Sequence, residues 1–319
     1  MRTVGGLLAL ALLSSGCENF LTGFAAGSTV RVVSRGSVGI QRAADPAMAE
    51  SAIPGSLSTL EALLVIKPDS EQLRLTMARS YASYGFGFME DHMEAAQAAD
   101  DDAHVEYYRA RATAAFLRAR QISYEMLSIW EPDDDGVEGA IHRGPDAWRR
   151  YLSQFDQESQ GGILFWGAYS WARYIGLHRD DPNALADLPY VIAMADRAKA
   201  LDHAYNGYAP HGLVGGLASA APAAVGGRPD IGRQEFEAAI AATQRHNLMY
   251  LVMEARIVAV ALQDRALYRR LLEEVINAGD VDPDLRLNNV LAKRRAFRYL
   301  AEIDNLFAPD EAPAATPGS

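Results

Sequence analysis

The sequence predicts an all-α protein, and three observations support this fold class. From Asp45 onward, apolar residues recur at intervals of three and four, which places them on one face of a helix. The alternation of apolar and polar residues that is typical of half-buried strands does not occur. Of the 319 residues, 49% are hydrophobic and 22% are charged, a composition typical of a folded globular chain.

The N-terminus has the parts of a secretory signal peptide in residues 1–16. Arg2 supplies a positive charge, Leu7–Leu13 is apolar, and small residues follow. Cys17 is the one cysteine, which excludes an intramolecular disulfide and cysteine-rich metal sites. Small residues directly before a cysteine resemble a bacterial lipobox, although Ser14 stands where leucine is usual. We predict that Cys17 carries a lipid anchor; the alternative is an ordinary signal peptide with a free thiol.

The mature chain divides by composition into a tether, a helical domain and a tail. Glycines punctuate residues 17–44, which we expect to form a lipidated tether. Residues 45–307 contain no interior linker and are expected to form one helical domain. Residues 308–319 are rich in proline and alanine and are expected to be disordered. Glu18, rather than aspartate, follows the cysteine and favours the outer membrane as the site of anchoring.

The predicted helices follow the apolar periodicity. The first has its stripe at Leu60, Leu63 and Leu64 and ends at Pro68. The second carries five residues on one face, at steps of 4, 4, 3 and 4: Leu73, Met77, Tyr81, Tyr84 and Phe88. The remaining predicted helices cover residues 102–129, 148–155, 163–177, 182–201, 208–219, 231–245, 248–262, 265–277 and 285–306.

A short spacing indicates a repeat. Steps of 5, 4 and 3 separate Gly227, Gly232, Phe236 and Ala239, as in the core of a tetratricopeptide repeat, a helical hairpin of ~34 residues. The steps of 4 and 3 recur at Ala112, Phe116 and Ala119 and at Val191, Ala195 and Ala198. Small residues let the helices of a hairpin approach closely. Residues 218–226 interrupt a regular repeat, so we predict an α/α superhelix of degenerate tetratricopeptide-like hairpins, with generic hairpins as the alternative.

Charge and motifs exclude several function classes. There are 30 basic and 41 acidic residues, so the net charge of −11 argues against a nucleic-acid partner. No zincin histidine pair, phosphate-binding glycine loop or nucleophile elbow occurs. The acidic run 133–136 lacks a calcium ligand at Val137, the next alternate position. We therefore predict no catalytic residues, no metal and no cofactor.

Aromatic residues are concentrated in the predicted helix of residues 163–177. Trp166 and Trp171 are five positions apart, so the rings cover more than one face of the helix. One interpretation is packing between hairpins, and the other is a pocket for an apolar ligand. Tyr205, Tyr208 and His211 lie among glycines, which favours close approach of a ligand or a helix. The candidate ligand residues are Tyr84, Phe165, Trp166, Tyr169, Trp171, Tyr205, Tyr208 and His211.

Three segments, residues 161–177, 200–227 and 236–248, together resemble the T component associated with TRAP-type transporters. Residues 60–73 and 285–307 are similar to the same family, so the resemblance covers nearly all of the mature chain. It implies a periplasmic lipoprotein of cryptic tetratricopeptide-like hairpins without catalytic residues, lipidated at Cys17.

The resemblance also implies partners. It implies a homotrimer with a pore through each protomer, which binds the solute-binding (P) component of a TRAP transporter and takes up a small, hydrophobic molecule. One alternative is a scaffold at the outer membrane that holds a peptide on the concave repeat surface without transferring a small molecule. Another is an enzyme whose catalytic groups are not local in sequence.

Overall fold

The computed structural model describes residues 39–132, 135–220 and 226–307, and these residues form helices without a β-strand. The predicted all-α class is therefore confirmed. Some predicted features lie outside the described residues: the signal peptide of residues 1–16, the lipid site Cys17, residues 17–38 of the tether, residues 221–225 of the repeat interruption, and the tail of residues 308–319.

The first helices begin at side chains that cap them. The Asp45 carboxylate accepts a hydrogen bond from the Ala47 amide at 2.9 Å, and α2 begins directly after it. The Ser70 hydroxyl caps α3 through the amide of Leu73. The helices in the first half of the chain are α2 (Pro46–Ile66), α3 (Glu71–Tyr84), η1 (Gly85–Glu90), α4 (Asp91–Ala98), α5 (Asp102–Trp130), α6 (Gly136–His142), α7 (Pro145–Leu152), η3 (Glu158–Gln160) and α8 (Gly161–Leu177).

The second predicted helix changes type before it ends. Its α-helical part stops at Tyr84, and Gly85–Glu90 form the π-helix η1. The absence of a side chain at Gly85 lets Phe116 of α5 approach, since a Cβ there would lie 2.9 Å from the phenyl ring. At the end of η1, Glu90 and Asp91 are each only 1% exposed. Such widened turns are frequent at functional sites and were not expected from the apolar spacing.

The second half of the chain differs from the prediction at two points. The predicted helix of residues 182–201 is divided at Asp187, because Pro189 has no amide hydrogen to continue the helical ladder. The predicted helix of residues 248–262 contains a second π-helix, η5. The helices are α9 (Pro182–Ala186), α10 (Leu188–Leu201), α11 (Tyr205–Ala218), α12 (Pro229–Ala242), α13 (Leu248–Met253), η5 (Glu254–Ala259), α14 (Val260–Leu262), α15 (Arg265–Asn277), η6 (Pro283–Leu285), α16 (Arg286–Ala301) and α17 (Ile303–Leu306).

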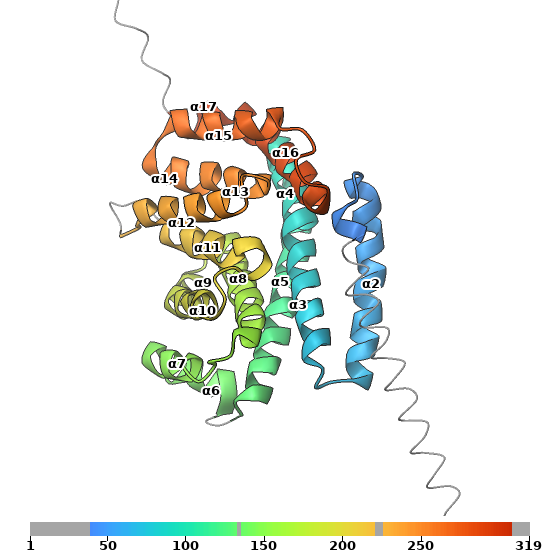
Figure 1. Cartoon of the computed structure of the whole chain (residues 1–319), viewed down its shortest axis with the longest axis vertical. Coiled ribbons are helices and arrows are strands. Elements are labelled where there is room, and N and C mark those ends of the chain that lie inside the picture. The colour runs from blue at the N-terminus through green and yellow to red at the C-terminus, as the bar shows by residue number, and fades with distance from the viewer. Residues whose placement is uncertain (1–38, 133–134, 221–225, 308–319) are drawn as a thin grey trace, which may run out of the picture.

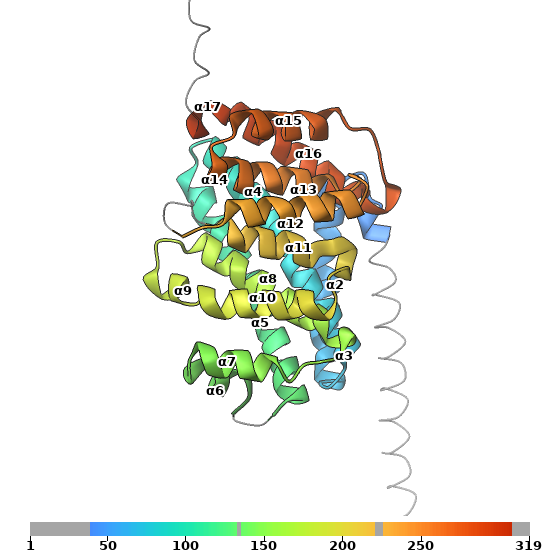
Figure 2. The ribbon, with the colours of Figure 1, turned by 60° about the vertical axis from the view of Figure 1, so that its left-hand side comes forward.

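The helices are arranged as an upright group and a stack that crosses it. Figure 1 shows α2, α3 and α5 standing side by side along one edge of the molecule. Figure 2 shows the later helices, from α7 to α15, lying one above another. The central helix α8 packs against α5, α3 and α10, and α11 packs against α10 and α12. Neighbours within the stack are therefore mostly neighbours in sequence.

Small residues allow close approach within the stack. A Cβ at Gly215 of α11 would lie 3.0 Å from the carbonyl oxygen of Gly232 in α12. The aromatic residue of the same spacing, Phe236, is 1% exposed and packs in the core. These contacts agree with the physical reason given for the repeat spacing, and the tetratricopeptide-like order of the hairpins stays a prediction.

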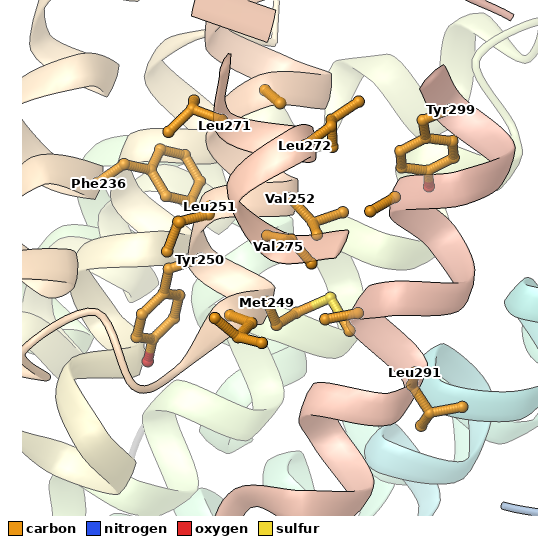
Figure 3. Packing of buried hydrophobic residues seen from close by; sticks show 14 of the residues in the cluster. Phe236, Met249, Tyr250, Leu251, Val252, Leu271, Leu272, Val275, Leu291 and Tyr299 are labelled. Carbon is orange, nitrogen blue, oxygen red and sulfur yellow. The ribbon is translucent and has the colours of Figure 1, made fainter. Parts of the chain in front are cut away.

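The buried apolar residues of the described chain form two clusters. One joins α2, α3 and α5 to α7, α8 and α10. The other lies between α12, α13, α15 and α16 and extends to η1 and α4. Figure 3 shows part of this second cluster, in which Phe236, Leu251 and Leu271 point toward one another from three helices.

Buried charges join the last long helix to the first half of the chain. Arg298 of α16 donates hydrogen bonds to Asp91 at 2.8 Å and to Glu94 at 2.6 Å. Arg295 donates to Glu94 at 3.2 Å and to the Phe86 carbonyl oxygen at 2.6 Å. We call this set, together with the pair from α8, the arginine network: Glu90, Asp91, Glu94, Arg173, Arg295 and Arg298.

Arg295 lies at the centre of the arginine network. It is 0% exposed, and its guanidinium carbon lies 4.0 Å from the centre of the Phe86 ring. Burial alone would lower the pKa of Arg295, but the carboxylates of Glu94 and Asp91 outweigh burial and raise it. Arg173 of α8 donates to Glu90 at 2.9 Å, so three helices meet at these charges.

Helix α2 has an exposed apolar side. By length and composition it is the one helix of the described residues that could cross a membrane, although 28% of its most apolar window is buried inside the protein. Its two acidic residues face inward: Glu50 bonds His92 at 3.0 Å, and Glu61 accepts a bond from Arg118 at 2.7 Å. Length and composition are weak evidence for a membrane span, and α2 also packs against α3.

We expect Arg295→Met to lower the free energy of unfolding by about 3–5 kcal/mol, because it removes one of the three cations that balance the three carboxylates of the arginine network and leaves the Phe86 carbonyl oxygen without its donor. Urea denaturation followed by circular dichroism measures this change. The matched control is Arg286→Met on the same helix, whose ion pair with Asp280 lies at the surface. The control is expected to change stability by less than about 1 kcal/mol. Equal stabilities of the two variants would contradict a central role for the arginine network.

Candidate functional site

The structure brings four of the predicted ligand residues together where α8 meets the start of α11. The rings of Phe165 and Trp166 lie 4.8 Å apart, and Phe165 lies 5.6 Å from Tyr205. The Trp166 indole donates a hydrogen bond to the Tyr205 hydroxyl at 2.9 Å. Tyr169 lies 5.7 Å from Trp166. We call Phe165, Trp166, Tyr169 and Tyr205 the aromatic cluster.

Two other predicted residues lie apart from the aromatic cluster. Trp171 faces another side of α8, where its indole donates to Asp187 at 2.9 Å and its ring stacks 6.1 Å from Tyr190. Tyr84 ends α3, and its hydroxyl accepts a bond from Arg111 at 2.6 Å. Sequence spacing cannot predict whether such residues lie close together in space, because the distances between them depend on how the helices pack.

The rings of the aromatic cluster are packed against one another. Phe165 is 2% exposed and Trp166 is 5% exposed, whereas Tyr205 is half-buried at the edge of the cluster. Burial raises the pKa of the Tyr205 hydroxyl above its ordinary value. A Cβ at Gly162 would lie 2.9 Å from the Tyr205 ring, so glycine is needed beneath it. A role of these rings in holding a ligand stays a prediction.

A left-handed turn follows Tyr205 directly. Asn206, Gly207 and Tyr208 have φ angles of 47°, 69° and 65°, so three consecutive residues lie in the left-handed region. Glycine and asparagine adopt it readily, but a tyrosine there is strained by about 1 kcal/mol or more. The Tyr250 hydroxyl holds the turn by donating to the Gly207 carbonyl oxygen at 2.6 Å. The predicted helix of residues 208–219 thus begins with an irregular turn.

Polar side chains from three helices meet beside this turn. His211 Nδ1 lies 2.7 Å from a Glu235 oxygen, and Lys199 donates to the same carboxylate at 2.6 Å. His203 Nδ1 lies 3.5 Å from His211 Nε2, and the Tyr208 ring lies 5.8 Å from the His203 ring. We call Lys199, His203, Tyr208, His211 and Glu235 the α11 cluster.

The sequence predicted only part of the α11 cluster. Tyr208 and His211 were candidates, whereas Lys199 and Glu235 were missed. Lys199 lies on α10 and Glu235 on α12, 36 residues later, so no local pattern connects them. The cluster surrounds one carboxylate with an ammonium group and an imidazole, and these three side chains are 15–26% exposed. This arrangement suits recognition of polar or acidic groups. Among the described residues, no group of three or more side chains is placed to hold a metal ion.

Two hollows lie away from the aromatic cluster. One of about 590 Å³ lies between α12, η5 and α15, and one of about 70 Å³ lies beside α7. None of the predicted ligand residues lines either hollow. We call the first hollow the Glu254 groove, because Glu254 of η5 lies in its wall and is 2% exposed. Glu254 is the one acidic residue in the apolar run 248–262, a signal that the sequence offered.

Comparison with known proteins agrees with the resemblance drawn from the sequence. A family model described as the TRAP transporter T-component matches residues 42–307, which is nearly the whole of the described chain. No curated protein sequence matches the chain.

Glu254 makes stability depend on pH. Burial first, and then the nearby Glu237 charge, raise the pKa of Glu254 from 4.5 to about 7. The folded state therefore holds this proton more tightly than the unfolded state does, so ionisation destabilises the fold as pH rises from 4.5 through about 7.

We expect Glu254→Gln to be more stable than the natural protein by about 1–3 kcal/mol at about pH 8.5, and the difference to vanish near about pH 4.5. Chemical denaturation at both pH values measures it. Glu138→Gln removes an exposed carboxylate on α6 and is the matched control. A difference that is the same at both pH values would show that ionisation of Glu254 is not its cause.

Proposed function

Because this chain belongs to the TRAP transporter T-component family, we propose that it is a periplasmic lipoprotein that docks the solute-binding component of a TRAP transporter. The observation that carries the proposal is the family match over residues 42–307. The signal peptide and lipobox-like Cys17 of the sequence support export and anchoring, with the outer membrane as the expected site. In this proposal the protein acts by binding and not by catalysis.

The α11 cluster is the proposed docking surface. Lys199, His211 and Glu235 come from three helices and are joined by short hydrogen bonds, so these groups are in place before a partner arrives. Lys199 and His211 place an ammonium group and an imidazole beside Glu235, whose carboxylate balances the Lys199 charge. Complementary charges favour encounter and orientation more than they add affinity, which suits a transient transport complex.

The aromatic cluster is the proposed site of a small hydrophobic ligand. Phe165, Trp166 and Tyr169 offer apolar faces, and Tyr205 stands between them and the left-handed turn. Displacement of the turn would move Tyr205 and uncover the rings. Docking at the adjacent α11 cluster would then raise the concentration of the solute at this opening. We propose that the assembly is a homotrimer held at the membrane by the acyl chains on Cys17.

A second candidate function is docking without transfer of a small molecule. The observation that favours it is the packing of the aromatic cluster, in which Phe165 is 2% exposed and Trp166 is 5% exposed. In this case the rings only stabilise the core, and the chain is an interaction scaffold.

We expect light scattering to detect a complex between the full chain and the solute-binding protein, and to give its stoichiometry. The double variant Lys199→Gln, His211→Gln is expected to weaken the complex at least about tenfold, because it removes the ammonium group and the imidazole from the α11 cluster. Arg149→Gln on α7, whose pair with Asp146 is exposed, is the control and should bind normally. Absence of a complex with the natural protein would refute docking.

Native mass spectrometry separates the two candidate functions. The first predicts that the purified protein retains a lipid-like molecule, and that Phe165→Ala lowers its occupancy while the fold is kept. The second predicts that no small molecule is retained and that docking is unchanged in this variant. Retention of a molecule that Phe165→Ala does not affect would place the ligand outside the aromatic cluster.

A further inference from the structure

Apolar and charged side chains both line the Glu254 groove; besides Glu254, the polar part of its lining consists of Glu237, Gln244, Arg245 and Arg270. Ile240 and Ala241 of α12 form one wall, and Leu267 and Leu271 of α15 form the other. The hollow measures about 590 Å³, within the range of sites that hold small molecules, ~300–1,000 Å³. Its rim is accessible, since Ala241 is exposed.

The Glu254 carboxylate has no partner within the part of the chain that the structure describes. It makes no hydrogen bond and no ion pair within 4.0 Å, although Arg233, Arg245 and Arg270 influence it from farther away. Two of these cations are already engaged, Arg233 with Glu237 at 2.9 Å and Arg245 with Glu274 at 2.6 Å. Arg270 is exposed, so water screens its charge.

Glu90 and Asp91, two other buried acids of this chain, are paired with arginines. Glu90 and Asp91 are as buried as Glu254, at 1% exposed each, and both have arginine partners in the arginine network. A buried carboxylate without a donor destabilises a fold at most sites, so buried acids are usually paired. Glu254 instead faces a hollow large enough for a molecule that would supply the missing donors.

We propose that the Glu254 groove binds a small organic ammonium ion, whose N–H groups bond to Glu254 and whose apolar part lies between Ile240 and Leu271. The carboxylates of Glu254 and Glu237 attract the cation, and the apolar part of the lining selects an alkyl or aromatic body. The site lies on the face of α12 that packs toward α15, whereas the α11 cluster uses Glu235 on another face of the same helix. It is therefore a second ligand site, independent of the aromatic cluster.

The test is calorimetric titration of the full chain in detergent with hexylammonium chloride, and in parallel with hexan-1-ol and sodium hexanoate. These probes share one alkyl chain and differ in the head group. Saturable binding of hexylammonium, with at least tenfold weaker binding of the other two probes, supports the proposal. Equal or tighter binding of hexanol or hexanoate, or no binding of hexylammonium, overturns it.

Two variants test whether hexylammonium binds in the Glu254 groove. Glu254→Gln keeps the side-chain volume and removes the charge, and it is expected to weaken hexylammonium binding at least tenfold. Ala241→Trp fills the groove from its exposed wall, leaves Glu254 in place, and is expected to abolish binding even if the first variant folds poorly. Glu138→Gln is the charge-matched control and should bind as the natural protein does. Unchanged affinity in Ala241→Trp overturns the proposed location.

Discussion

The pairing of buried charges in the arginine network is the constraint on which the arrangement of the helices depends. Of the three carboxylates at the end of η1 and the start of α4, Glu90 and Asp91 are 1% exposed and the Glu94 side chain is 17% exposed, and arginines from α8 and α16 neutralise them. A buried ion pair adds little to stability by itself, but loss of one partner is severe. The last long helix must therefore pack against α4, and the helices between them must span the distance. At one end of the stack in Figure 2, ion pairs as well as apolar packing hold α16 against α4.

Two departures from low-energy structure lie beside α12. On one side, Glu235 of α12 binds Lys199 and His211 next to the strained turn at Asn206–Tyr208. On the other side, Ile240 of α12 borders the groove that contains the unpartnered Glu254. Stable folds carry strain and unpaired charge mainly where binding uses them. The two proposed sites thus share one helix, and a ligand at either site contacts the same rigid element.

Apolar periodicity was sufficient to predict the fold class and most helices, because a face that repeats every 3.6 residues needs no knowledge of tertiary structure. It failed where spacing stays regular while the backbone changes, as in η1 between Tyr84 and Phe88. It placed Phe165, Trp166 and Tyr205 among the candidates but gave no indication of whether rings line an opening or fill a core. Apolar periodicity could not predict that Lys199 and Glu235 meet, since only the packing of α10 on α11 and of α11 on α12 brings them together.

The contact between α4 and α16 also joins distant parts of the chain. Arg295 and Glu94 are 201 residues apart in sequence, so this contact requires the closure of a long loop, and contacts of this kind slow folding. Asp91 and Glu94 of α4 gain the partners Arg295 and Arg298 only when α16 has been made. A chain that ends before α16 lacks both arginines, so the charge balance of the first half of the fold depends on its last long helix.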